Sequence, residues 1–237
     1  MKRSPTLLLS LTVMLFVLLS ASKCNNKPAK SAKEEAIELY EKGLNFDKAG
    51  MYKDALLYYS LAIEKDSLKV NAFTNRGGVK EILGDTIGAI DDYLTAIRID
   101  SLNVIALNNM GCLYSQMLHS EKAEYYYLKA MAVDSSYANT YYNYALTLFE
   151  NRQEQCAIKY FQRVGSLERA MEERYRKEGL YNYMMDDYYT MRAFSYYFLG
   201  LCYKRMGNME KAVDYLRLAE EENVTGAADS LKAITQK

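Results

Sequence analysis

The sequence predicts an all-α protein, an α-solenoid of about five helix-turn-helix units followed by a C-terminal capping helix. Small and aromatic residues return every 34 positions through most of the chain, a period typical of stacked helix pairs. The 237 residues include only 12 glycines and two prolines, Pro5 and Pro28, so long helices can form without interruption. The composition, 50% hydrophobic and 25% charged, is typical of a globular protein and excludes a disordered or collagen-like chain.

Residues 1–23 have the layout of an export signal. Lys2 and Arg3 form a charged start, the apolar run Leu7–Leu19 follows, and small residues end the segment. The run is too short to span a bilayer comfortably, so a secretory signal peptide is favoured over a membrane-spanning helix. A buried core helix is the other alternative, and the basic flank at the extreme N-terminus disfavours it.

Cys24 stands where bacterial lipoproteins carry the cysteine that becomes acylated, and the segment resembles theirs. We expect lipidation at Cys24, with residues 24–35 as a lipid-anchored polar tether on the membrane, because each buried acyl methylene adds about 0.8 kcal/mol. The alternative is ordinary signal cleavage after Ser22, because Lys23 occupies a place where lipoproteins have a small residue. Either route predicts an exported protein of the cell envelope, facing the periplasm or the cell surface.

The repeat consists of four columns of residues in one register. Gly43, Gly77 and Gly111 are each 34 positions apart, and Ala145 continues the series. The other three columns are Ala55, Ala89, Ala123 and Ala157, then Tyr59, Tyr93, Tyr127 and Phe161, then Ala62, Ala96, Ala130 and Val164. A fifth copy, Gly200, Ala212, Leu216 and Ala219, follows an insertion. Small residues on two successive helices allow the helices to approach closely, and the aromatic residue fills the remaining space.

These columns closely resemble the tetratricopeptide repeat family, which has a small residue at position 8, Ala at 20, an aromatic at 24 and Ala at 27. The resemblance covers four repeats in residues 36–171 and a fifth in 193–226. It implies a right-handed superhelix whose concave surface is lined by the first helix of each pair. Residues 227–237 are expected to form the C-terminal cap, because terminal units of a solenoid need a more polar outer face.

The insertion at residues 172–192 is rich in Tyr and Met. Helical spacing through Ala170, Met171 and Tyr175 predicts that the flanking helices lengthen into a hairpin that turns near Gly179. The tyrosines of this region either form an interaction edge or pack on the fourth and fifth repeats. Those concerned are Tyr175, Tyr181, Tyr183, Tyr188 and Tyr189.

Asparagine recurs at position 6 of three repeats, as Asn75, Asn109 and Asn143. A carboxamide donates and accepts hydrogen bonds, so such a row can hold a peptide main chain without selecting its sequence. The row resembles the asparagine ladder with which some tetratricopeptide repeat solenoids hold peptides, although Asn is also common at this position. The other candidate peptide-binding residues are Tyr40, Leu44, Asn71, Ile105, Asn139, Tyr142, Leu146, Phe149, Tyr197 and Leu201. This mixed apolar and amide surface suits a semi-extended segment.

Composition and motifs oppose the other functional classes. With 30 basic and 30 acidic residues the chain lacks the basic excess of nucleic-acid binders, and removing residues 1–23 leaves 27 basic residues, a net charge of −3. The one histidine, His119, has no nucleophile or orienting acid in a catalytic pattern. We therefore expect no enzyme activity, cofactor, metal or small-molecule substrate. Cys112, Cys156 and Cys202 form no CxxC pair and are expected to be buried thiols.

These observations predict a non-enzymatic protein–protein interaction scaffold of the cell envelope that binds an extended peptide segment on its concave surface. The alternative is a structural or assembly subunit of an envelope complex that binds through the convex face and the Tyr-rich insertion.

Overall fold

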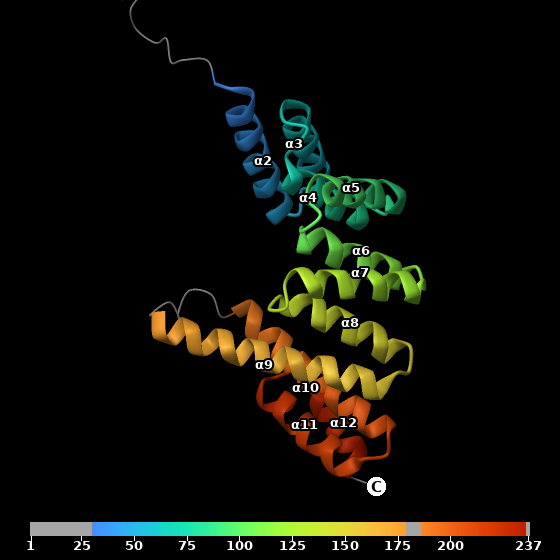
Figure 1. The fold of residues 1–237 in the computed structure, drawn as a ribbon. Coiled ribbons are helices and arrows are strands. Elements are labelled where there is room, and N and C mark those ends of the chain that lie inside the picture. Colours follow the sequence, from blue (N-terminus) through green and yellow to red (C-terminus); the bar gives the residue numbers. More distant parts are fainter. Residues whose placement is uncertain (1–29, 179–185, 236–237) are drawn as a thin grey trace, which may run out of the picture.

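The structure, a computed structural model, describes residues 30–178 and 186–235, and in this part eleven α-helices and no strands are present. They stack into an elongated superhelix that runs from α2 to α12 (Figure 1). In chain order the helices are α2 (Ala32–Lys48), α3 (Tyr52–Lys65), α4 (Val70–Ile82), α5 (Thr86–Ile99), α6 (Val104–Gln116), α7 (Ser120–Val133), α8 (Ala138–Glu150), α9 (Glu154–Glu178), α10 (Asp186–Arg205), α11 (Met209–Glu221) and α12 (Ala227–Thr235). The predicted all-α solenoid is confirmed.

The helices form five hairpins, α2–α3, α4–α5, α6–α7, α8–α9 and α10–α11, and α12 packs against α11. The first helices of successive hairpins also touch one another, α4 with α6, α6 with α8, and α8 with α10. These helices, with α2 at the N-terminal end, form a continuous surface that we call the A-helix face. Its helices carry every peptide-binding candidate named from the sequence.

The repeated glycines are needed because a tyrosine ring occupies the space beside them. A Cβ atom added at Gly43 or Gly111 would lie 2.6 Å from Cδ1 of Tyr59 or Tyr127, closer than real side chains approach. Both rings are fully buried. The missing side chain thus lets the aromatic ring of the second helix lie directly on the backbone of the first, which fixes the spacing within each hairpin.

The second hairpin contains a buried ion-pair network in place of an apolar contact. Asp92 is only 1% exposed, and its two carboxylate oxygens accept from Arg76 Nη2 at 2.6 Å and Nε at 2.8 Å. Lys80 Nζ lies 2.8 Å from Asp92 Oδ2, and Arg76 Nη1 donates to Ser60 Oγ at 3.1 Å, which links the second hairpin to the first. Two cations therefore share one buried carboxylate.

Helices α9 and α10 are longer than those of the other hairpins, with 25 and 20 residues. They run side by side, and their extended ends project from the stack beside the grey trace of residues 179–185 (Figure 1). The turn predicted near Gly179 lies outside the described residues. The side chains of the five tyrosines that were predicted to form an interaction edge or to pack on the fourth and fifth repeats also lie outside them. The export signal and residues 24–29 of the tether, Cys24 included, also lie outside them.

The thiols divide into three environments. Cys202 is buried and Cys112 is half-buried, and burial raises their pKa values to about 12 and about 11. Cys156 is exposed on the outer side of α9, so the expectation of a buried thiol is wrong at this position. The helical apolar pattern around Cys156 does not show which of its faces meets solvent.

A buried carboxyl group lies where the long hairpin joins the fifth unit. Glu168 on α9 is 5% exposed, and burial raises its pKa to about 8, opposed by the charge of the nearby Arg192 guanidinium. That guanidinium also bridges Glu172 at 3.3 Å and Glu222 at 3.1 Å, and so links α9, α10 and the residue after α11. The charge state of Glu168 therefore bears on the packing of three helices.

We expect stability to fall as pH rises from about 4.5 to 8, because the folded protein keeps a proton on Glu168 that the unfolded chain has released. Glu168→Gln should reduce this slope and stabilise the protein by on the order of 2 kcal/mol at pH 9. Urea denaturation between pH 5 and 9 measures both effects. Glu173→Gln, an exposed position on the same helix, is the control, and an equal change in that variant would contradict the assignment.

Candidate functional site

The three repeated asparagines lie in one row on the A-helix face, and each donates to a side chain of the preceding unit. Asn75 Nδ2 donates to Tyr40 Oη at 3.1 Å, Asn109 Nδ2 to Tyr93 Oη at 3.5 Å, and Asn143 Nδ2 to Asn108 Oδ1 at 3.2 Å. All three asparagines are half-buried. One amide hydrogen of each thus joins neighbouring units, and the Asn109 amide oxygen also accepts from Asn108 Nδ2 at 3.2 Å. Each amide has a second N–H group and oxygen lone pairs with which it can bind a ligand.

Two tyrosines of the repeat column make hydrogen bonds to carboxylates within their own helix pairs. Tyr59 donates to Asp47 Oδ2 at 3.0 Å, and Tyr93 donates to Glu81 Oε2 at 3.1 Å, in each case twelve positions back in the same unit. Burial, followed by the neighbouring carboxylate charge, raises the pKa of both phenols. They remain neutral hydrogen-bond donors at physiological pH. The carboxylates are thereby held at the edge of the A-helix face.

The middle of the A-helix face, on α4 and α6, is more open than its two ends. Asn71 is exposed and Ile105 is 47% exposed, whereas Tyr40 and Leu44 are half-buried against the core of the first hairpin. Among the candidates of the fourth unit, Asn139 and Leu146 are half-buried. An extended ligand would therefore meet the exposed Asn71 and Ile105 beside the asparagine row.

The C-terminal part of the face is closed by aromatic packing. Phe149 is 7% exposed, because the Arg205 guanidinium lies 3.6 Å from its ring centroid and Phe198 packs edge-on at 5.2 Å. Arg205 also donates to the Phe149 carbonyl oxygen at 3.0 Å. The candidate Phe149 is thus a core residue between the fourth and fifth units and does not line an open surface.

The remaining candidates of the fourth and fifth units join the same packing. Tyr142 meets Phe161 edge-on at 6.0 Å, and burial raises the pKa of Tyr142 to about 12. Tyr197 meets Phe198 edge-on at 5.5 Å, and Leu201 packs on this core. The sequence showed that these positions share a face. It did not show that their rings would cover one another, because that depends on contacts between units.

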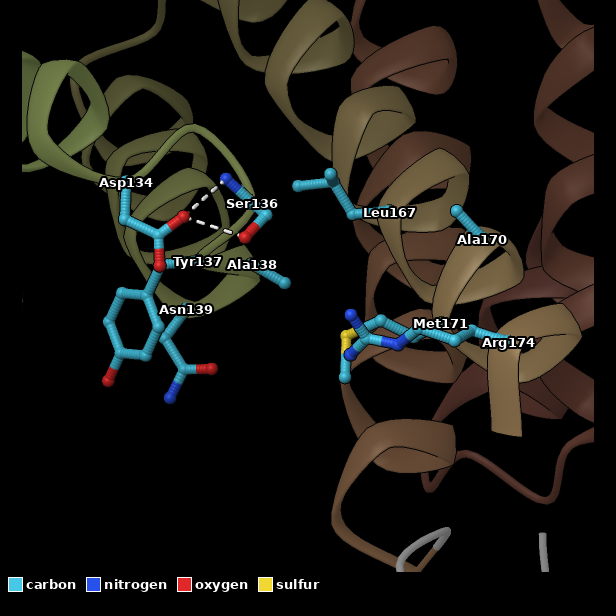
Figure 2. A pocket seen from close by; sticks show the side chains of 9 residues that line it. All are labelled: Asp134, Ser136, Tyr137, Ala138, Asn139, Leu167, Ala170, Met171 and Arg174. Atoms are coloured by element: carbon cyan, nitrogen blue, oxygen red, sulfur yellow. Dashed lines mark hydrogen bonds between the residues drawn. The ribbon is translucent and has the colours of Figure 1, made fainter. Parts of the chain in front are cut away.

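A cavity of about 340 Å³ that sequence reasoning missed lies between α9 and the turn that joins α7 to α8 (Figure 2). Leu167, Met171 and Arg174 of α9 face Tyr137 and Asn139 across it (Figure 2). A second cavity, of about 520 Å³, adjoins an earlier part of α9 and includes Met131 and Tyr141. The sequence signal for the first cavity was the helical spacing that continues through Ala170 and Met171.

Residues 30–178 and 186–235 contain no group of three or more His, Cys, Asp and Glu side chains placed to hold a metal ion. Among the helices of these residues, none combines the length and hydrophobicity needed to cross a membrane.

Comparison with known proteins shows which proteins the chain is similar to. The tetratricopeptide repeat family profile matches residues 195–223. Human tetratricopeptide repeat protein 6 is 28% identical over 119 residues, which cover 50% of this chain and 23% of the human protein. A probable UDP-N-acetylglucosamine–peptide N-acetylglucosaminyltransferase SPINDLY of Arabidopsis thaliana is 34% identical over 86 residues, 36% of this chain and 9% of that protein. The chain thus spans less than a quarter of the length of these relatives.

Solved structures support the same fold. A MamA crystal structure superposes with a TM-score of 0.59 at 19% identity, covering 82% of this chain and 95% of that one. YrrB, described as a tetratricopeptide repeat protein with an unusual peptide-binding site, gives a TM-score of 0.58 at 19% identity, covering 85% and 93%. The chain therefore matches the tetratricopeptide repeat profile at residues 195–223 and has the same solenoid fold as these structures.

Proposed function

We propose that this protein is a non-enzymatic scaffold that binds an extended peptide segment of another protein on its A-helix face. Tetratricopeptide repeat proteins bind other proteins or peptides. The observation that carries the proposal is the row of Asn75, Asn109 and Asn143, which the fold brings together with one amide hydrogen of each already bound. No cofactor or small-molecule substrate enters the proposal.

The expected binding mode follows from what each amide has left to offer. A side-chain amide has two N–H groups and a carbonyl oxygen, so an asparagine that gives one N–H to its neighbour can still pair with a peptide N–H and C=O. At Asn109 the oxygen already accepts from Asn108 Nδ2, so a peptide N–H would use its second lone pair. The internal hydrogen bond fixes the amide before the ligand arrives, which lowers the entropic cost of binding. The closed packing at Phe149 limits the segment to the first four units.

Replacing Asn109 and Asn143 by Ala should weaken peptide binding by about tenfold or more, because each change removes hydrogen bonds worth about 1 kcal/mol net. Partners recovered by cross-linking from native envelopes would be titrated against the variant and the unchanged protein. Asn45→Ala, an exposed asparagine on α2, is the matched control. Equal affinity of every recovered partner for the double variant and the unchanged protein would reject this mode of binding.

We further propose that the scaffold is held at a membrane of the cell envelope through a lipid on Cys24. The motivation is the charged start, the apolar run and the position of Cys24 in the sequence. Cys24→Ser should move the protein from the membrane fraction to the soluble fraction of the envelope, as immunoblotting of fractionated cells would measure. Cys156→Ser controls for loss of a thiol, and a Cys24→Ser protein that stays with the membrane would contradict lipidation.

A further inference from the structure

The two adjacent glycines of α4 have different surroundings. A Cβ atom added at Gly77 would lie 2.7 Å from Cε1 of Tyr93, so this fully buried ring requires the glycine. A Cβ atom added at Gly78 would meet one atom within 4 Å, Tyr93 Oη at 3.6 Å, which is an ordinary van der Waals contact. Packing therefore does not require Gly78, although glycine is a poor residue for the interior of a helix.

Gly78 leaves a space on the A-helix face where the other units have a side chain. It stands at position 9 of its unit, and its counterparts in the other four units are Leu44, Cys112, Leu146 and Leu201. All four of these side chains are half-buried. We call the space left by the missing side chain the Gly78 notch. Gly165 also has room for a Cβ atom, so space alone does not mark a site.

Polar groups of α4, α5 and α6 surround the Gly78 notch. Tyr93 Oη lies at its base and donates to Glu81 Oε2 at 3.1 Å. Asn109 Nδ2 donates to the same phenol oxygen from α6, at 3.5 Å. Asn75 and Glu81 lie one helical turn before and after Gly78, on the same side of α4. A group that enters the notch is therefore close to two asparagines of the row and to the Glu81 carboxylate.

Among the described residues, Glu81 is paired with no cation. Its Oε2 accepts from Tyr93 and its Oε1 accepts from Gln116 Nε2 at 3.1 Å, and both donors are neutral. The two cations of α4, Arg76 and Lys80, are held in the buried ion-pair network of the second hairpin. A carboxylate has about four lone-pair sites, so Glu81 can bind a further donor while it keeps these two hydrogen bonds.

The first unit has a similar carboxylate but no notch. Asp47 accepts from Tyr59 at 3.0 Å, as Glu81 does from the tyrosine of its own unit. Position 9 of the first unit is Leu44, which fills the space that Gly78 leaves open. The glycine at position 9 and a carboxylate without a cation therefore coincide in the second unit.

We propose that the Gly78 notch selects basic peptides, by taking up the side chain of a lysine or arginine whose cationic end pairs with Glu81. This inference rests on the proposed function, because the asparagine row would hold the peptide main chain beside the notch. The long apolar stem of such a side chain can lie on the Gly78 backbone, and its charged end then forms a charge-assisted hydrogen bond. An acidic side chain would be repelled by the charge of Glu81.

The test titrates the purified full chain with a labelled peptide that alternates Ser and Leu and carries one Lys at its centre. Two copies carry Gln or Glu in place of that Lys. Fluorescence anisotropy at low salt should show binding of the Lys peptide, about tenfold weaker binding of the Gln copy, and weaker binding still of the Glu copy. Glu81→Gln should weaken the Lys peptide by about tenfold and leave the Gln copy unchanged, which isolates the pair. Asp91→Asn, which removes an exposed charge on α5, should change neither.

Filling the notch is an independent test. Gly78→Leu gives the second unit the side chain found in three other units, and it should weaken the Lys peptide to the level of the Gln copy. Because the space is open and leucine favours helix, this variant should not lower the melting temperature. Equal binding of the three peptides to the unchanged protein would overturn the proposal, as would a Glu81→Gln protein that keeps its preference for Lys.

Asn143→Ala separates this proposal from the function on which it rests. Asn143 lies in the fourth unit, and its loss should weaken all three peptides alike, by about fivefold. If it does so while the three peptides bind the unchanged protein equally, the main-chain binding mode stands and the notch proposal fails. If Asn143→Ala has no effect while Glu81→Gln removes the preference for Lys, the notch is supported and the asparagine row fails. If no peptide binds, both fail.

Discussion

Replacing Asp92 by Ala should lower the free energy of unfolding by about 3–5 kcal/mol, because it leaves two partly buried cations without their shared carboxylate. Arg76 and Lys80 are each only 18% exposed in their side chains and both point at Asp92. Since each unit of a solenoid is stabilised by its neighbours, the change should also weaken the coupling of the first hairpin to the rest. Urea denaturation followed by far-ultraviolet circular dichroism measures the loss.

The neighbouring Asp91 supplies a matched control. It is exposed, so Asp91→Ala should change stability by no more than about 0.5 kcal/mol. Replacing the whole network, with Arg76→Leu, Lys80→Tyr and Asp92→Ala together, should recover most of the loss, because apolar packing can substitute for a buried ion network. An Asp92→Ala protein as stable as the Asp91→Ala protein would show that the network contributes little.

Replacing Gly111 by Ala should destabilise the protein by about 1–3 kcal/mol, although Ala is the better helix former. The new Cβ would lie 2.6 Å from Cδ1 and Cε1 of Tyr127, and that ring is buried and cannot move aside. Overpacking of this kind outweighs the roughly 1 kcal/mol that Ala gains over Gly in a helix. Thermal denaturation should show a fall of several degrees, at about 2–4 °C for each kcal/mol.

Gly165 offers the opposite case on α9. No atom lies within 4 Å of a Cβ added there, so Gly165→Ala should keep the helix-propensity gain and raise stability by up to about 1 kcal/mol. The two substitutions are chemically identical and differ only in what the methyl group meets. If both variants shifted stability in the same direction, the contact between Gly111 and Tyr127 could not be what fixes the hairpin spacing.

The sequence predicted those features that every unit shares. The glycine, alanine and aromatic columns reflect contacts that recur inside each hairpin. In the structure, the Tyr59 ring packs on Gly43 and the Tyr127 ring packs on Gly111. The lengthening of α9 was also visible, because Ala170 and Met171 keep the helical spacing. By contrast, the burial of Phe149 under Arg205 joins positions 56 residues apart and occurs once, so it leaves no period in the sequence.

The candidate peptide-binding site shows the same division. The recurrence of asparagine at Asn75, Asn109 and Asn143 placed them on one face, and the fold does bring them into a row. Their partners Tyr40, Tyr93 and Asn108 could not be foreseen, because no residue type recurs at one position of the preceding unit: Tyr40 and Asn108 share position 5 but differ in type, and Tyr93 is at position 24. Whether the row holds a peptide remains for the asparagine variants to test.

The sequence by itself determined that this protein is a stack of helical hairpins. Residues that recur at a fixed period make the same local contact in every unit, so the period reveals that contact. Only the tertiary structure decided the features that occur once. They are the charge network of Arg76, Lys80 and Asp92, the closed end of the A-helix face, and the cavity between α9 and the α7–α8 turn. Each depends on side chains from different helices meeting in space, and a contact made once gives the sequence no pattern to repeat.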